Sequence, residues 1–359
     1  METLPYISIR PNYISTYNLP EFQKQRTKRQ VDNQVNLLDN DTHGMVSRKA
    51  NKRVKEAIDW LVMLSKQKKF KSKKTGKTYT FNINFVTLTL SSKQVHSDQI
   101  IKSKLLNQFL IELKRDFKVM NYLWRAESQK NGNIHFHIVT DKFVPHDWLR
   151  DCWNRIQNKL GYIDRYHTFM AEFHKKGFKV REDLLKYWNY KSQLRAYKVG
   201  QKGNWYNPNS TDVHSIRKLR NISAYLSKYC TKNGKTKFVP NGKRRSYTVK
   251  NNGVYDTFTI QCVKEVITER PILGKLWGLS NSLSKLSSAI DFRFGEVYQE
   301  LAMIRNKFKS CVKEFDYTTV YYVSVRDWLK VCKGALFRIL SRYIVEWKEK
   351  CSIPKPIIN

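Results

Sequence analysis

Residues 122–140 hold two β-rich segments joined by a short polar turn, and this pair constrains the fold more than any other part of the chain. In the second segment, NIHFHIVT, Phe136 and its apolar neighbours two residues away alternate with His135 and His137. Side chains two apart on a strand point to the same face. We therefore expect a half-buried strand that presents two imidazoles on the face opposite its apolar side chains.

The register of this hairpin follows from the length of its loop. A two-residue turn would pair Glu127 with Phe136 and mix a charged face with an apolar one. A three-residue loop at 130–132, with its glycine in the left-handed conformation, pairs Ala126 with Phe136 instead. Because a one-residue slip moves every side chain to the other face, the apolar pattern selects the longer loop. The same register sets Glu127 opposite His135.

Two imidazoles and one carboxylate on one face make a candidate metal site. The predicted ligands are His135, His137 and Glu127. This set suits a divalent cation such as Mg²⁺ or Mn²⁺, which would keep coordination positions open for phosphate oxygens. The neighbouring segment FVTLTL adds Thr87 and Thr89 on one face as supporting residues, although β-propensity alone also accounts for threonine in a strand.

A predicted amphipathic helix, SIRKLRNISAYLSKYCTK, supplies a second set of candidate groups. Tyr225 and Tyr229 are four residues apart, so they are neighbours on one side of the apolar stripe. Lys228 and Lys232 each follow a tyrosine by three residues. A phenol is a weak nucleophile near neutral pH, but adjacent ammonium groups and a metal-bound phosphate would favour the phenolate. The alternative is a tyrosine pair packed at the core edge beside solvated lysines.

The charge of the chain indicates a polyanionic partner. Its 359 residues include 67 Lys and Arg against 30 Asp and Glu, a formal net charge of +37. Solubility does not require so large an excess. Aromatic residues, 13% of the chain, are interleaved with the cations. This mixture suits single-stranded nucleic acid, whose unpaired bases stack while its phosphates are neutralised.

Several other classes of protein are excluded by missing motifs. The six cysteines are scattered without a CxxC pair, which predicts reduced thiols rather than a zinc ribbon or a disulfide framework. TGKT and NGKTK lack the glycine that a phosphate-binding loop requires, so we expect no nucleotide-hydrolysing motor. No apolar run reaches the roughly 18 residues of a membrane helix.

The order of predicted elements indicates an α+β fold in which helices flank a central antiparallel β-sheet. We expect residues 1–77 to form a basic N-terminal extension that is irregular to about residue 45 and then contains one helix. Residues 78–240 hold the motifs, interrupted by an insertion near 162–210. Residues 241–359 are predicted to form a mixed, mainly helical C-terminal region.

Three of these segments, taken together, resemble the motifs of HUH endonucleases. They are FVTLTL, GNIHFHIV with Glu127 eight residues before His135, and AYLSKYCTK. Their order, with histidines before tyrosines, is similar to that of rolling-circle replication initiators. The spacing YxxKYxxK resembles the two-tyrosine initiators of small single-stranded DNA phages and related plasmids. The resemblance covers about residues 79–232 and implies a ferredoxin- or RRM-like HUH domain.

The resemblance also implies a site-specific nickase and ligase acting on single-stranded DNA at a replication origin. The metal held by the two histidines and Glu127 would polarise the scissile phosphate. Tyr225 or Tyr229 would attack it, leaving a 5′-phosphotyrosine and a free 3′-OH primer, and the other tyrosine would cut the regenerated origin. Lys228 and Lys232 would position the phosphate or deliver protons. A host helicase and a host DNA polymerase would be the protein partners, in the cytoplasm of a bacterial host, with no membrane involved.

Two alternatives stay open at this point. A two-tyrosine HUH transposase would share the same chemistry, and would be favoured by element ends flanking the coding region rather than by an origin hairpin near it. A non-catalytic single-stranded nucleic-acid-binding protein would use the histidines and tyrosines only for packing and stacking. A magnesium-dependent covalent adduct with DNA would separate an enzyme from this binding protein.

Overall fold

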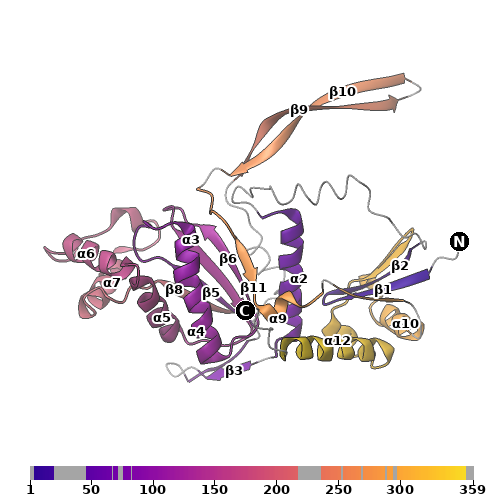
Figure 1. Ribbon diagram of the computed structural model, residues 1–359, viewed down its shortest axis with the longest axis horizontal. Helices are drawn as coiled ribbons and strands as arrows, with labels where there is room; N and C mark the ends of the chain where they lie inside the picture. The colour runs from indigo at the N-terminus through magenta and orange to yellow at the C-terminus, as the bar shows by residue number, and fades with distance from the viewer. Residues whose placement is uncertain are drawn as a thin grey trace, which may run out of the picture.

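The structure, a computed structural model, describes most of the chain. The residues outside the description are 1–3, 20–45, 67, 72–75, 82, 217–235, 252–253, 268–269, 288, 294–296 and 353–359. The described residues form two five-stranded antiparallel sheets, two separate two-stranded hairpins and several helices (Figure 1). This is an α+β fold, as the sequence predicts.

The central sheet has the strand order β11-β6-β7-β5-β8, and all neighbours are antiparallel. Its strands are β5 (Ile83–Thr89), β6 (Tyr122–Ser128), β7 (Ile134–Thr140), β8 (Thr211–Ile216) and β11 (Trp277–Leu279). The β6–β7 hairpin occupies its middle and one side, with β5 as the other neighbour of β7. The histidine-bearing strand therefore lies at the centre of the sheet, where both neighbours fix its register.

The turn between β6 and β7 has the predicted geometry. Ala126 pairs with Phe136, as the three-residue loop requires. The N–H of Gln129 donates to the carbonyl of Asn133 at 2.8 Å, and the N–H of Gly132 donates to the carbonyl of Gln129 at 2.9 Å. Gly132 has a φ of 82°, a left-handed conformation that glycine adopts without a side-chain clash. The predicted register is confirmed.

Helices cover one face of the central sheet and bury its apolar residues. They are α3 (Asp98–Ile100), the π-helical segment η1 (Ile101–Leu106), α4 (Asn107–Phe117) and α5 (His146–Asn158). Phe136 is fully buried and its ring meets that of Trp153 edge-on at 6.3 Å. Phe109 from α4 contacts Trp153 in the same way at 5.8 Å. Edge-to-face pairs of this kind stabilise a core beyond the area they bury.

The opposite face of the sheet is divided between a second core and a polar region. At one end, Phe85, Leu123 and Val139 pack in a cluster that also contains residues of α2 (Arg48–Leu64). The side chain of Ser47 caps α2 by accepting the N–H of Ala50, as expected for a helix N-cap. In Figure 1, α2 stands between the two five-stranded sheets. The other end of this face carries the histidines.

The second sheet joins the two ends of the chain and corrects one prediction. Its order is β12 (Ile290–Arg293), β1 (Leu4–Arg10), β2 (Tyr13–Leu19), β14 (Thr318–Tyr321) and β13 (Val312–Phe315). The prediction of an irregular arm from the N-terminus is wrong for residues 4–19, which form the β1–β2 hairpin. Ile7, Ile9 and Ile14 on this hairpin have no exposed surface. The apolar alternation was hidden by Pro11 at the turn and by partner strands from the far end of the sequence.

The remaining elements connect or extend these two sheets. Around the second sheet and α2 lie α9 (Asn281–Ser284), α10 (Tyr298–Lys307), η3 (Lys309–Cys311), α11 (Val325–Trp328) and α12 (Ala335–Ser352). The insertion after α5 forms α6 (Tyr162–Phe173), η2 (Glu182–Leu184) and α7 (Tyr190–Lys202). The separate hairpins are β3 (Lys68–Lys71) with β4 (Thr78–Phe81), and β9 (Thr236–Asn251) with β10 (Val254–Ile267). The β9–β10 hairpin extends away from the body of the molecule (Figure 1).

These arrangements bear on how the chain is divided. Strands from the predicted N-terminal and C-terminal regions share one sheet, and β11 from the C-terminal region forms an edge of the central sheet. The boundaries drawn from the sequence stay a prediction. Within the described segments, none of the helices is long and apolar enough to cross a membrane.

Candidate functional site

The candidate site is a cluster of three side chains on the polar end of the central sheet. Glu127 on β6 lies directly opposite His135 on β7, and His137 follows two residues later on the same face. Oε2 of Glu127 lies 3.5 Å from Nε2 of His135 and 3.7 Å from Nε2 of His137. One ligand atom from each residue lies within 4.8 Å of the other two. The structure thus brings together the three residues predicted from the hairpin register.

The protonation states in this cluster favour a cation. Burial would raise the pKa of Glu127, but its contacts with His135 and His137 outweigh that and lower the pKa to about 2. Burial lowers the pKa of His135, although Glu127 opposes the shift. Near neutral pH the cluster therefore holds an ionised carboxylate and a neutral His135 imidazole, which is the form in which histidine binds metals.

Unpaired polar atoms in the cluster also fit a metal. Oε1 of Glu127 and Nδ1 of His135 are buried, and neither has a hydrogen-bond partner among the described residues. Leaving a buried polar atom unpaired costs about 1–3 kcal/mol. A divalent cation accepts carboxylate and imidazole donors together. The donor set of these residues therefore fits the Mg²⁺ or Mn²⁺ that the sequence analysis expects.

The neighbouring strand β5 holds one of the histidines in place. Oγ1 of Thr87 lies 3.1 Å from Nδ1 of His137, and the ring of Phe85 stacks on the imidazole at 5.0 Å. These two contacts leave Nε2 of His137 pointing toward Glu127. Residues that bind the second ring nitrogen of a metal ligand fix its tautomer and its orientation. Thr87 is therefore placed to support the site, as predicted.

The second supporting threonine has a different contact. The hydroxyl of Thr89 donates to the carbonyl of Ser210 at 3.0 Å, and the backbone N–H of Thr89 donates to the same carbonyl at 2.9 Å. Thr89 lies opposite His135 across the β5–β7 pair. Its hydrogen bonds tie the end of β5 to the segment before β8 rather than orienting a ring nitrogen.

One charged residue of this face was missed by the sequence analysis. Arg125 lies opposite His137 in the β6–β7 register and is almost fully buried. Its Nη1 donates to the carbonyl of Leu276, next to β11. The alternation of WRAES already sets Arg125 on the same face as Glu127, so the signal was available in the sequence. It brings a fixed positive charge beside the cluster, which favours an anionic ligand there.

The predicted tyrosines and lysines lie outside the described residues. Tyr225, Lys228, Tyr229 and Lys232 fall within 217–235. The chain enters this segment from β8, the edge strand next to β5, and leaves it into β9. The roles of these four residues stay predictions.

Comparison with known families gives one match. A family model for replication-associated proteins of the ORF2 type matches residues 83–234. The matched segment begins with β5, includes Glu127, His135 and His137, and continues through the tyrosine segment. No curated protein matches the chain. The family match supports a replication initiator, with DNA at an origin as the partner that such a role implies.

Proposed function

We propose that the protein initiates rolling-circle replication by nicking single-stranded DNA at an origin through HUH-type chemistry, and later rejoins the strand. One observation carries this proposal. An ionised Glu127 lies between two imidazoles on adjacent strands, within a segment that matches a replication-associated family. A binding protein without catalytic activity has no need of a half-buried polar cluster whose atoms lack partners.

Under this proposal, His135, His137 and Glu127 would hold one Mg²⁺ or Mn²⁺ ion. When bound, the ion would polarise the scissile phosphate and offset the negative charge that develops during transfer. The neutral His135 and the ionised Glu127 are already in their metal-binding forms. Few protein ligands leave room for phosphate oxygens, as phosphoryl chemistry requires.

The covalent step would use a tyrosine of the segment that follows β8. The phenolate oxygen of Tyr225 or Tyr229 would form a bond to phosphorus, and the bond from phosphorus to the 3′ oxygen would break. The 3′ oxygen would leave with a proton as a free 3′-OH, which primes a host polymerase, while the 5′ end stays on the tyrosine. Lys228 and Lys232 would stabilise the phenolate and the phosphate, or supply the proton. A host helicase would unwind the duplex in the cytoplasm of the host cell.

Two tyrosines suit alternation between successive cuts. On a helix, residues four apart are displaced by about 40° around the axis and roughly 6 Å along it. Two phenols so placed can reach one phosphate in turn, but both cannot hold the in-line position at once. We therefore infer that one tyrosine carries the DNA while the other cuts the regenerated origin.

The test is a mass-mapped tyrosyl–DNA peptide from a reaction with the element's own origin oligonucleotide. Tyr225→Phe and Tyr229→Phe should each retain some cleavage, and each should release fewer closed circles than wild type. The double variant should form no adduct, and wild type in EDTA should form none. Alternation is wrong if one single variant is inactive while the other releases circles like wild type. A complete lack of adduct in wild type with Mg²⁺ or Mn²⁺ would leave a non-catalytic binding protein.

A further inference from the structure

The insertion between α5 and β8 differs in composition from the rest of the chain. Eleven of residues 162–210 are Phe, Trp or Tyr, and ten Lys or Arg stand against four Asp or Glu. Its elements α6, η2 and α7 lie beside the central sheet at one end of the molecule (Figure 1). Between them and the end of β5 is a cleft of about 820 Å³. The cleft is large enough for one or more nucleobases.

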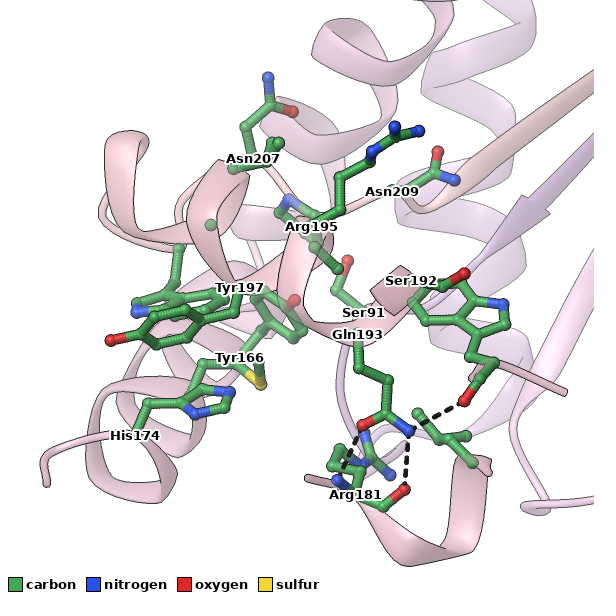
Figure 2. A pocket seen from close by; sticks show the side chains of 18 of the residues that line it. Ser91, Tyr166, His174, Arg181, Ser192, Gln193, Arg195, Tyr197, Asn207 and Asn209 are labelled. Carbon is green, nitrogen blue, oxygen red and sulfur yellow. Dashed lines mark hydrogen bonds between the residues drawn. The ribbon is translucent and has the colours of Figure 1, made fainter. Parts of the chain in front are cut away.

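Aromatic rings and cations line this cleft together. Tyr166, His174 and Tyr197 gather at one side of it, and Arg195 projects from α7 (Figure 2). Trp188 also lines the cleft and remains 48% exposed. Aromatic faces beside a positively charged groove bind single strands, because bases stack on the rings while the cations neutralise phosphates.

The wall of the cleft behind the aromatic rings is tightly built. The imidazole of His174 stacks on the indole of Trp205 with ring centres 5.1 Å apart. Trp205 has a left-handed φ of 60°, and its ring lies so close to Gly200 that a Cβ there would come within 1.9 Å. A non-glycine residue in this conformation costs of order 1–3 kcal/mol and persists only where its surroundings enforce it. The packing around Trp205 therefore fixes the wall.

A buried amide holds the loop that carries Trp188. Gln193 is only 6% exposed. Its amide group accepts the N–H of Arg181 at 2.8 Å and donates to the carbonyls of Arg181 and Trp188 at 3.1 and 3.0 Å (Figure 2). These bonds fix the backbone on both sides of η2. Trp188 is thus an exposed ring on a fixed support.

The cleft begins next to the candidate metal site. Thr89 lines it and lies opposite His135 across the β5–β7 pair. A second hollow of about 520 Å³ shares Tyr166 and Arg181 with the cleft and extends to Asn131 in the β6–β7 turn. A strand bound at the metal cluster would therefore have neighbouring nucleotides beside both hollows.

We propose that this cleft binds unpaired nucleobases next to the scissile phosphate and so contributes to the choice of origin sequence. The proposal rests on the proposed function for the position of the scissile phosphate. Trp188 supplies a stacking face at the rim, and Arg195 contacts the backbone phosphates. Bases held in a duplex cannot enter, because their faces are already stacked. The cleft therefore selects single strands.

The test measures binding without cleavage. Fluorescence anisotropy in EDTA would follow an oligothymidylate of about twelve nucleotides, within the site sizes known for single-strand binders. Trp188→Ala should weaken binding about tenfold, the change that ~1.4 kcal/mol of lost stacking produces. Binding of an abasic oligonucleotide of the same length should be unchanged by Trp188→Ala. Trp188→Phe, which keeps an aromatic face, should restore most of the affinity.

Arg195→Ala separates stacking from charge neutralisation. It should weaken binding of both oligonucleotides and lower the slope of log affinity against log salt by about one. Matched controls are Tyr317→Ala, a 79% exposed ring at the β13–β14 turn, and Arg342→Ala on α12. Both controls should bind like wild type, and thermal melts should show all variants folded.

The two hypotheses fail in different ways. If Trp188→Ala and wild type bind oligothymidylate equally, or if Trp188→Ala loses abasic binding to the same extent, the cleft is not a nucleobase site. That result leaves nicking and the tyrosyl adduct untouched. If wild type forms no adduct while Trp188→Ala still weakens binding selectively, the proposed function fails and the nucleobase site stands.

Discussion

The two faces of the central sheet are built from the same strands but in opposite ways. On the helix-covered face, Phe136 is fully buried and its ring packs against Trp153 from α5. On the other face, His135 keeps a buried nitrogen with no partner among the described residues. One face is apolar and filled, and the other holds polar atoms that the described part of the fold does not satisfy.

This difference indicates a separation of roles between adjacent residues. A sequence that specifies one structure satisfies its buried polar groups, and the exceptions concentrate at functional sites. The helix-covered face should therefore determine stability, and the polar face should determine activity. Substitutions one residue apart on β7 should have opposite consequences.

The largest expected effect is the loss of nicking in His135→Ala. Without this ligand the cation would be lost or displaced, and nicking should fall by roughly 10³-fold, which corresponds to ~4 kcal/mol of the barrier. The free energy of unfolding should change by no more than about 1 kcal/mol, because the lost imidazole has an unsatisfied nitrogen. Cleavage of a labelled oligonucleotide and a denaturant titration measure the two quantities. Nicking by wild type that survives in EDTA would contradict this prediction.

The neighbouring residue should give the reverse result. Phe136→Ala removes a fully buried ring from the helix-covered face and should lower the free energy of unfolding by about 3–5 kcal/mol. Phe136→Leu, which retains most of the volume, should cost about 1.5 kcal/mol or less. Denaturant titration measures both, and cation affinity of the folded fraction should stay as in wild type. Equal destabilisation by Phe136→Ala and His135→Ala would show that the two faces are not divided in this way.

A pH-dependent contribution should also be confined to the helix-covered side. Asp98 in α3 is almost fully buried, and it accepts two hydrogen bonds from Arg270 and one from the N–H of Leu273. Burial would raise the pKa of Asp98, but these bonds and that of Gln94 outweigh it and lower the pKa. Asp98→Asn should therefore cost about 1.5–3 kcal/mol of stability near neutral pH.

The sign of the pH effect follows from the lowered pKa. A carboxyl whose pKa is lower in the folded state stabilises the fold fully above its unfolded value of about 3.9. This stabilisation is lost as the pH falls through the folded-state pKa. The difference between wild type and Asp98→Asn should thus be constant from about pH 5 to 8 and shrink below about pH 4. Cation affinity should be the same in both proteins, and a difference that grows toward acid would contradict the assignment.

The predictable part of the molecule is the part whose contacts are local in sequence. The register of β6 and β7 follows from a three-residue loop and an apolar alternation within 122–140, so Glu127 and His135 could be paired from sequence alone. Helices with a clear apolar period were predicted for the same reason. The π-helical segment η1 was not, because its wider hydrogen bonding leaves the apolar spacing almost unchanged.

The rest depends on contacts that a single sequence does not reveal. β1 pairs with β12, which lies at the other end of the chain, so nothing near the N-terminus identifies its partner. The insertion at 162–210 shows no clear apolar period, because many of its aromatic residues face a cleft or solvent rather than a core. Arg125 was overlooked because its charge suggested an exposed position, whereas the fold buries it beside His137.

The smallest expected effect sharpens the comparison within the polar face itself. Thr87 and Thr89 lie on one strand and one face, but only Thr87 contacts a ring nitrogen of the cluster. For Nε2 of His137 to bind a cation, Nδ1 must carry the proton and donate it to Oγ1 of Thr87. Thr87→Val keeps the shape and the β-propensity but removes the acceptor, so Mn²⁺ affinity should fall about tenfold. Calorimetric titration with Mn²⁺ measures this directly. Thr89→Val, which loses only the bond to Ser210, should bind Mn²⁺ like wild type, and equal losses in both variants would mean that the threonines act through packing.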